Sequence, residues 1–256
     1  MSSNDSTSKT LLVALVLCIV CSVLVSGAAV MLKPKQQQNK ELDMKTNILK
    51  AAGLYQEGVS VADQFASVKE KIVDLESGRF SDAVEASSYD QRKAAKDPAL
   101  SVKLEKENDI AGIGRQVKYA KVYIVEDEGG LDKVILPIKG YGLWSTLYGF
   151  LALEEDLNTV AGLGFYEHGE TPGLGGEVDN PSWKAKWVDK HVYSDGKVAL
   201  SVIKGTSDPS SNKHTYQIDG LSGATLTSKG VDNLIKFWMG ENGFAPFLEN
   251  LKHGDA

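Results

Sequence analysis

Apolar residues form their longest uninterrupted run near the N-terminus. Residues 11–32 carry no ionisable side chain other than two thiols, and lysines flank the run on both sides. As an α-helix, a run of this length would extend about 33 Å, enough to cross a hydrocarbon core of about 30 Å. The pattern therefore predicts a short N-terminal tail over 1–10, a transmembrane helix over 11–32 and a polar stalk over 33–40. A cleaved signal peptide is the alternative, but its apolar core is usually only about 7–15 residues long.

Periodic apolar positions predict helices in further regions. A helix over 41–52 is expected to end at Gly53. From Ser60, a candidate N-cap, apolar residues recur at helical spacing up to Gly78, and this spacing predicts a second helix. Near the C-terminus, a closing helix over 227–239 would bury one apolar face, made of Val231, Leu234, Ile235 and Trp238.

Runs rich in β-branched and aromatic residues, separated by glycines, predict strands between these helices. The expected strands cover 117–125, 134–138, 159–167, 198–203 and 215–218. No internal repeat and no second linker is evident in the sequence. We therefore expect one α+β fold, in which an N-terminal transmembrane helix is followed by a single mixed-sheet extramembrane domain over 41–256.

Composition narrows the classes of function. A hydrophobic content of 42% and a charged content of 24% are ordinary for a globular protein. The net charge of −6 argues against a nucleic-acid partner, which would require a basic face. Both cysteines, Cys18 and Cys21, lie within the apolar N-terminal run, so the expected extramembrane domain has no thiolate for a zinc or iron–sulfur site. The histidines are isolated along the sequence, and we predict no metal site.

A segment rich in hydroxyls precedes the closing helix. Residues 219–228 read DGLSGATLTS and follow a predicted strand. Free N–H groups and the helix dipole favour a phosphate at a helix N-terminus, and the small residues would let the backbone approach it closely. Ordinary capping by Thr227 or Ser228 explains part of the same pattern, and the sequence alone leaves both interpretations open.

Two other segments combine glycine with residues that are suited to binding. Residues 140–145 read GYGLWS and place a large flat ring beside glycines. Residues 167–176 read EHGETPGLGG and are too rich in glycine and proline for a regular element. Most segments of this kind are turns.

Taken together, three motifs resemble those of the FMN-binding domain family. They are Gly142–Ser145 (GLWS), His168–Gly175 (HGETPGLG) and Asp219–Ser228 (DGLSGATLTS), in this order along the chain. Members of this family carry FMN joined by a phosphoester to the threonine of the SGAT sequence. With the N-terminal anchor and the chain length, the whole chain is similar to the family of flavin-carrying C subunits of the sodium-translocating NADH:quinone oxidoreductases of bacteria.

The resemblance implies a role for each matching residue. Thr225 would be the covalent attachment point of FMN. A separate flavin transferase, which uses FAD, would read a motif made of Asp219, Gly220, Ser222, Gly223, Ala224 and Thr227, of which the last four would also line the cofactor. The remaining residues that would bind the cofactor, near its ring or in a loop that closes over it, are Trp144, Ser145, Glu170, Thr171, Leu174 and Gly175.

The same resemblance implies an electron carrier rather than a complete enzyme. Such a subunit works in a membrane complex that oxidises NADH, reduces ubiquinone and pumps Na+, with no complete active site of its own. Its partners would be the other subunits, the flavin transferase and the lipid bilayer. The corresponding flavin subunit of the ferredoxin:NAD electron-transfer complex is an alternative within the family.

The charges around the apolar run disagree with the orientation that the resemblance implies. Lys33, Lys35, Lys40 and Lys45 outnumber Lys9, and the positive-inside rule alone would place the domain in the cytoplasm. The resemblance implies a single-pass protein of the bacterial inner membrane with its domain in the periplasm. Because long domains cross membranes largely regardless of charge, we expect the periplasmic orientation.

Two interpretations from other classes are weaker. Gly220–Ala224 falls one residue short of the G-x-S-x-G motif of serine hydrolases, and His253 is the only histidine after Ser222. A non-catalytic assembly subunit with an empty pocket would carry the same fold but no flavin. A dinucleotide site is not expected, because Gly162–Glu167 does not complete G-x-G-x-x-G and precedes no predicted helix.

Overall fold

The N-terminal apolar run belongs to one long helix. The computed structural model describes residues 6–256, and its first helix is α1 (Thr7–Ala51). The predicted membrane segment over 11–32 lies within α1, whereas the first five residues of the predicted tail lie outside the described residues. By length and composition α1 can cross a membrane.

The predicted stalk over 33–40 and the predicted helix over 41–52 are continuous with the membrane segment in α1. Pro34 lies inside the helix and does not end it. A proline removes one backbone hydrogen bond to the preceding turn, but the glutamines, lysines and glutamate that follow are good helix formers. The two helices predicted on either side of a stalk are therefore one element.

The chain divides into two compact units, Met1–Asp43 and Met44–Ala256. The last turns of α1 belong to the second unit, where Ile48 and Leu49 are fully buried. The C-terminal end of α1 is therefore part of the core of the second unit.

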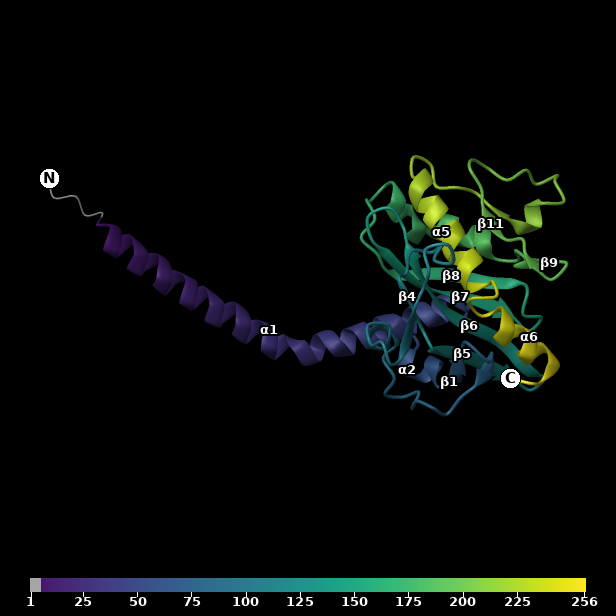
Figure 1. The fold of residues 1–256 in the computed structure, drawn as a ribbon, viewed down its shortest axis with the longest axis horizontal. Helices are drawn as coiled ribbons and strands as arrows, with labels where there is room; N and C mark the ends of the chain where they lie inside the picture. Colours follow the sequence, from purple (N-terminus) through teal and green to yellow (C-terminus); the bar gives the residue numbers. More distant parts are fainter. Residues whose placement is uncertain (1–5) are drawn as a thin grey trace. The chain divides into compact units, whose positions relative to one another are not determined.

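A six-stranded sheet forms the centre of the second unit, and every neighbouring pair of its strands is antiparallel (Figure 1). The order is β2-β1-β5-β6-β7-β8. The strands are β1 (Val68–Asp74), β2 (Arg79–Phe80), β5 (Tyr119–Asp127), β6 (Gly130–Tyr141), β7 (Thr146–Glu154) and β8 (Val160–Glu167).

Three two-stranded pairs complete the strand inventory of the described residues. Two are antiparallel: β3 (Ser101–Lys103) with β4 (Arg115–Val117), and β9 (Tyr193–Ser194) with β10 (Lys197–Val198). The third pair, β11 (Ser201–Val202) with β12 (Gln217–Ile218), is parallel. The predicted α+β class is confirmed. Among the strand pairs of the described residues, the parallel one is β11 with β12.

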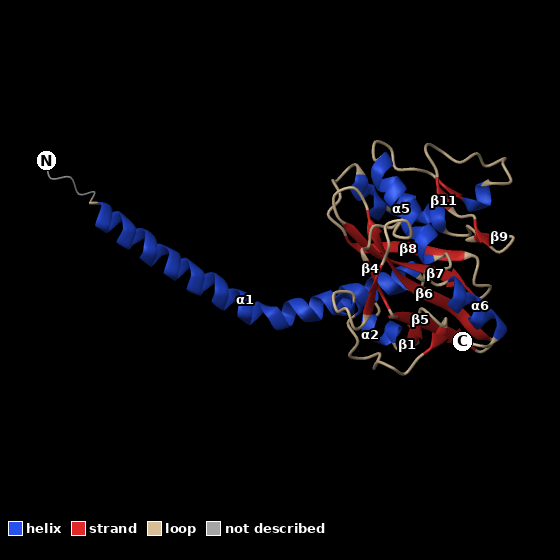
Figure 2. Cartoon of the chain, viewed as in Figure 1, coloured by secondary structure: helices blue, strands red, loops and turns tan. Residues whose placement is uncertain are grey.

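Helices flank the sheet, as Figure 2 shows by colour. The α-helices of the second unit are α2 (Val61–Phe65), α3 (Gln91–Ala94), α4 (Pro181–Lys184), α5 (Thr225–Trp238) and α6 (Ala245–His253). Short 3-10 turns are η1 (Gly175–Asp179), η2 (Ala185–Trp187) and η3 (His214–Tyr216). The predicted closing helix corresponds to α5, and its four predicted core residues are buried. Residues 245–253 form a further helix that the sequence pattern did not predict.

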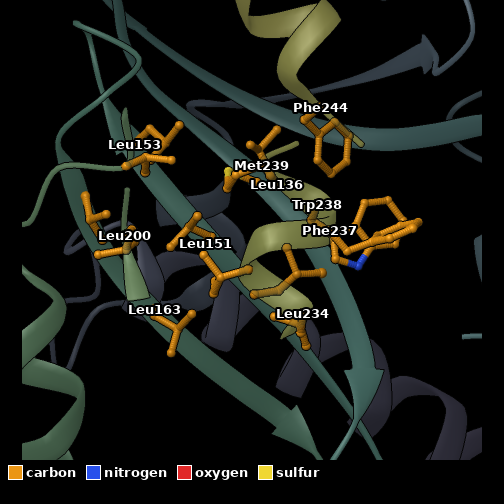
Figure 3. Close-up of a cluster of buried hydrophobic side chains, with 14 of the residues drawn as sticks. Leu136, Leu151, Leu153, Leu163, Leu200, Leu234, Phe237, Trp238, Met239 and Phe244 are labelled. Atoms are coloured by element: carbon orange, nitrogen blue, oxygen red, sulfur yellow. The ribbon is translucent and has the colours of Figure 1, made fainter. Parts of the chain in front are cut away.

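Alternation along the strands gives the sheet two apolar faces. Successive side chains of a strand point to opposite faces. One face carries Leu136 and Leu151 and packs with Leu234 and Trp238 of α5, as Figure 3 shows. The other face carries Ile135, Phe150 and their neighbours, and packs with the end of α1 and with α2. The sheet is therefore covered on both sides, and α5 is fixed along the larger core.

The predicted helix from Ser60 to Gly78 is wrong over most of its length. Its first part is the short helix α2, but residues 68–74 form β1, which pairs with β5 over its whole length. Val68, Ile72 and Val73 gain burial from strands distant in sequence, so tertiary pairing overrides the local helical spacing. Strand β7 was missed because both its faces are largely buried, and its near-continuous apolar run lacks the alternation expected of a strand.

The burial of Ile48 against one face of the sheet predicts an effect on stability. Ile48→Ala should lower the free energy of unfolding by about 2–5 kcal/mol, because it removes a fully buried side chain from the second core. Denaturant unfolding of the full chain in detergent measures this change. Val59→Ala, at an exposed position, is the control and should change the same quantity by less than about 0.5 kcal/mol. Equal effects of the two variants would contradict the packing of α1 into the domain.

Candidate functional site

The Thr225 side chain is exposed at the first position of α5. The helix begins at Thr225, its N-cap residue is Ala224, and no side chain caps it. The Ser228 hydroxyl instead donates to the Ala224 carbonyl at 3.0 Å and accepts the Leu221 N–H at 2.9 Å, while Thr227 bonds elsewhere. The capping interpretation of Thr227 and Ser228 is therefore wrong. The positive end of the helix dipole, with its uncapped N–H groups, lies beside the free Thr225 hydroxyl.

Glu170 joins α5 to the turn at residues 142–145. One carboxylate oxygen, Oε1, accepts the backbone N–H groups of Leu143, Trp144 and Ser145 at 3.1, 2.9 and 3.1 Å. The other, Oε2, accepts the Thr227 hydroxyl at 2.7 Å. Glu170 is only 5% exposed, so these bonds replace the water that the carboxylate loses on burial.

The hydrogen bonds also determine the charge of Glu170. Burial, the largest single influence, raises its pKa, but the bonds from Thr227 and from the three backbone N–H groups together hold the pKa below the ordinary value. The carboxylate is therefore ionised at neutral pH. Its two oxygens accept hydrogen bonds from the chain itself, which leaves little capacity to accept others.

The loop over 168–176 is organised around the same carboxylate. Gly169 donates its N–H to the Ser145 hydroxyl at 2.6 Å. The Thr171 carbonyl accepts the N–H groups of Leu174 and Gly176 at 3.1 and 2.9 Å. A Cβ on Gly175 would lie 2.6 Å from the Thr227 hydroxyl oxygen, so only glycine allows this approach of the loop to α5. The predicted residues Ser145, Glu170, Thr171, Leu174, Gly175 and Thr227 are thus brought together.

Large apolar side chains remain exposed next to this polar network. Trp144 is 66% exposed, Leu226 is 61% exposed and Leu174 is 45% exposed. Leu174 lies against the loop before α5, because a Cβ on Gly223 would be 3.0 Å from its Cδ2 atom. Leu226 directly follows Thr225 in α5. Exposed apolar side chains of this size, next to an exposed hydroxyl, are the surroundings that an apolar ring tethered at Thr225 would require.

The structure places Asp219 and Gly220 at the start of the same loop, with the Asp219 carboxylate directed to other parts of the chain. Asp219 Oδ2 forms an ion pair with Lys186 at 2.6 Å, and Oδ1 accepts the Ser207 N–H at 2.7 Å. The Asp219 carbonyl accepts the indole N–H of Trp183 at 2.8 Å. Sequence reasoning did not find these partners, because no local pattern links them to residue 219.

The serine hydrolase interpretation finds no support in this arrangement. His253 Nε2 lies 2.9 Å from Glu249 on α6, and the structure does not bring it to Ser222. The Ser207 hydroxyl does lie 2.8 Å from His214 Nδ1, but Ser207 is buried and is not available as a nucleophile. Among residues 6–256, no group of three or more His, Cys, Asp or Glu side chains is placed to hold a metal ion.

The lowered pKa of Glu170 predicts a change of stability with pH. The Glu170 pKa is lower in the folded chain than in the unfolded chain, where it is near 4.5. Such a carboxyl stabilises the fold at pH values above the unfolded pKa. This contribution is lost as the pH falls through the folded pKa. Glu170→Gln should therefore lower the free energy of unfolding at pH 7 by about 1–3 kcal/mol and flatten its decline below pH 4.5. Denaturant titrations at several pH values measure both effects. Glu249→Gln, at an exposed position, is the control, and identical pH profiles for Glu170→Gln and the unmodified chain would contradict the assigned charge.

The three motifs lie within a range that matches a known family. A family model described as the FMN-binding domain matches residues 142–240, a range that contains all three motifs. The C subunit of the Na(+)-translocating NADH-quinone reductase of Pseudomonas aeruginosa is 60% identical over 261 residues, and the match covers 100% of both chains. The protein of the same name from Yersinia pestis is 47% identical over 258 residues, covering 98% of this chain and 96% of its own.

Solved structures show the same fold. The crystal structure of NqrC from Shewanella oneidensis superposes with a TM-score of 0.77 at 37% identity, covering 84% of this chain and 99% of that chain. The C subunit of the reductase from Parabacteroides distasonis gives a TM-score of 0.64 at 27% identity, covering 85% of this chain and 96% of that one. The likeness to full-length relatives, together with the motifs around Thr225, shows that this chain belongs to the NqrC family, the C subunits of the Na(+)-translocating NADH-quinone reductases.

Proposed function

We propose that this chain is the electron-carrier subunit of a Na+-translocating NADH:quinone reductase and that it holds FMN as a phosphoester on Thr225. One observation carries the proposal: the exposed hydroxyl of Thr225 at the uncapped start of α5, within the range that matches the FMN-binding domain. The names of the relatives support the reductase over the ferredoxin:NAD complex. In this proposal NADH oxidation, ubiquinone reduction and Na+ pumping are shared with other subunits, and this chain carries electrons without a complete active site of its own.

The residues present fit such a cofactor. A phosphate at Thr225 would lie at the positive end of the α5 dipole, where an anion is stabilised. Trp144 and Leu174 would contact the flavin ring with their exposed apolar surfaces, and Ser222, Gly223 and Ala224 would line its phosphate end. When bound, the flavin supplies the acceptance and release of electrons, while the protein orients it and controls its surroundings.

Attachment requires one group-transfer step at Thr225. The Thr225 hydroxyl oxygen forms a bond to the flavin-side phosphorus of FAD, the phosphoanhydride bond of FAD breaks, AMP leaves, and the hydroxyl proton is released. A separate flavin transferase would supply the catalytic groups. Thr225 itself contributes the nucleophilic oxygen and an accessible position.

Glu170 and Thr227 would hold the cofactor's surroundings rather than take part in electron transfer. Their hydrogen bond fixes the start of α5 relative to the turn that carries Trp144. Both side chains are buried and form their hydrogen bonds within the chain. They can therefore orient the site without forming hydrogen bonds to the ring. The tether at Thr225 then keeps the cofactor at high effective concentration in this site.

The proposed location is based on α1 and on the family of the chain. We propose that residues 11–32 cross the bacterial inner membrane once, that residues 33–40 leave the bilayer and that the domain from residue 41 onward lies in the periplasm. The support is the length and composition of α1 together with the family to which the chain belongs. The lysines at 33 and 35 oppose this orientation by the positive-inside rule, so direct labelling is the decisive test.

Removal of the Thr225 hydroxyl tests the attachment site. Thr225→Ala, produced as the full chain together with the flavin transferase, should fold but show no ultraviolet fluorescence in the denatured band, because no oxygen remains to carry the phosphoester. Thr225→Ser keeps a hydroxyl at the same position and should retain fluorescence. A fluorescent Thr225→Ala band would place the attachment elsewhere.

Trp144 tests the position of the ring. Trp144→Ala should shift the visible absorption of the bound flavin without reducing the fluorescence of the denatured band, because the side chain touches the ring but not the phosphoester. Tyr55→Ala, which removes an aromatic side chain outside the site, should leave the spectrum unchanged. An unaltered spectrum in Trp144→Ala would remove Trp144 from the flavin surroundings.

The topology can be read from a single cysteine. Gln37→Cys, with both native cysteines replaced by serine, should react in intact cells with a thiol reagent that cannot cross the inner membrane. Asp5→Cys in the same background should react only after the cells are broken. The reverse pattern would place the domain in the cytoplasm.

A further inference from the structure

The start of the attachment loop is fixed by residues outside the motif. Asp219 uses one carboxylate oxygen for Lys186 and the other for the Ser207 N–H, and its carbonyl accepts the Trp183 indole N–H. Its side chain is 17% exposed, whereas that of Lys186 is 47% exposed. Both oxygens of the carboxylate are therefore already engaged within the folded chain.

Neighbouring segments bring these partners to Asp219. The parallel pairing of β11 with β12 places residues 203–207 alongside the start of the loop. Gly220 donates its N–H to the Gly205 carbonyl at 3.0 Å, and a Cβ on Gly220 would lie 2.4 Å from the Ile203 carbonyl oxygen. Ser207 is held in turn by His214, whose Nδ1 lies 2.8 Å from the serine hydroxyl. The Asp219–Gly220 pair thus packs closely against the backbone of residues 203–207.

Trp183 is itself held in the core of the domain. It lies at 6% exposure in α4, and its ring packs edge-on against Trp187 at a centroid distance of 5.4 Å. The indole N–H that reaches Asp219 therefore comes from a rigid position. The motif is connected through this bond to the main hydrophobic cluster.

The other end of the loop is fixed as well. The Ser228 hydroxyl accepts the Leu221 N–H and donates to the Ala224 carbonyl, which closes the loop onto the first turn of α5. Between the two fixed ends, the exposed residues are Ser222, Gly223, Thr225 and Leu226. The loop therefore presents the Thr225 hydroxyl outward while its ends face the chain.

We propose that Asp219, through Lys186 and Trp183, is a positioning residue for covalent flavin attachment, and that the flavin transferase recognises the folded loop rather than the Asp219 carboxylate. This proposal rests on the proposed function, because it concerns the step that loads Thr225. It assigns to Lys186 and Trp183, which lie outside the motif, a role in presenting the hydroxyl. If the transferase instead bound the Asp219 carboxylate directly, Lys186 would compete with the transferase for it.

Rates of flavin attachment distinguish the two possibilities. The full chain is incubated with purified transferase and FAD, and the fluorescence of the denatured band is followed with time. Lys186→Met should slow attachment about two- to fivefold, the range expected for loss of a half-exposed ion pair, and Lys186→Arg should restore it. Lys69→Met, which removes a similarly exposed ion pair with Glu126, should leave the rate unchanged. An unchanged or faster rate in Lys186→Met would overturn the proposal.

Two further variants sharpen the test. Trp183→Phe keeps an aromatic ring, although a smaller one, and removes the indole N–H. It should slow attachment about fivefold, because the Asp219 carbonyl loses its partner. The double variant Asp219→Asn with Lys186→Met should accept flavin no more slowly than Asp219→Asn alone. Both changes break the same ion pair, so the second change has nothing further to remove. Fully additive effects on the rate would show that Asp219 acts independently of Lys186 and would contradict the proposal.

Amide hydrogen exchange gives a readout that does not depend on flavin. In the full chain produced without transferase, the amides of residues 219–228 should exchange faster in Lys186→Met and Trp183→Phe than in the unmodified chain or in Lys69→Met. Unchanged exchange would refute the positioning role even if flavin attaches normally. If exchange is faster in the two variants but the unmodified chain never accepts flavin, the proposed function is refuted. The contacts that position the loop would still be supported.

Discussion

The candidate site depends on one buried carboxylate. Glu170 accepts three successive backbone N–H groups from the turn at residues 143–145 and the hydroxyl of Thr227 from α5. Because an ionised carboxylate is costly to bury without such partners, the turn, the loop over 168–176 and the helix must come together or the site does not form. This single constraint links three segments that are far apart in sequence and fixes the surroundings of Thr225.

The rest of the domain supplies a rigid support for that arrangement. Helix α5 is anchored along its apolar face by Leu234 and Trp238 on a sheet that is covered on both sides. In its first turn Thr225 and Leu226 are exposed whereas Thr227 and Ser228 are buried, so Thr225 is accessible on a helix that is held in place. Buried polar groups therefore hold the geometry, and exposed apolar groups such as Trp144 and Leu174 are left for a ligand. This division of roles suits the proposed flavin, which would be bonded to the chain at Thr225 and would exchange electrons through its ring.

Local sequence patterns predicted some parts of this structure and not others. The apolar face of α5 follows from short-range spacing, whereas Thr225 as the attachment point and the loops around it came only from the resemblance to the FMN-binding domain. By contrast, β1 was predicted as a helix, because its burial comes from pairing with β5, which no local pattern records. The partners of Asp219 were missed for the same reason: Lys186 and Ser207 are ordinary surface-type residues until the fold brings them to the motif. Contacts between distant segments, rather than residue types, were the missing information.

The central claim is that the hydroxyl at the start of α5 carries a permanently bonded nucleotide. Intact-mass spectrometry of the full chain, purified from cells that produce it together with its membrane complex, tests this most directly. The account predicts a mass that exceeds the polypeptide by FMN less one water, with the addition located on the peptide that contains Thr225. A mass equal to that of the polypeptide alone would contradict it.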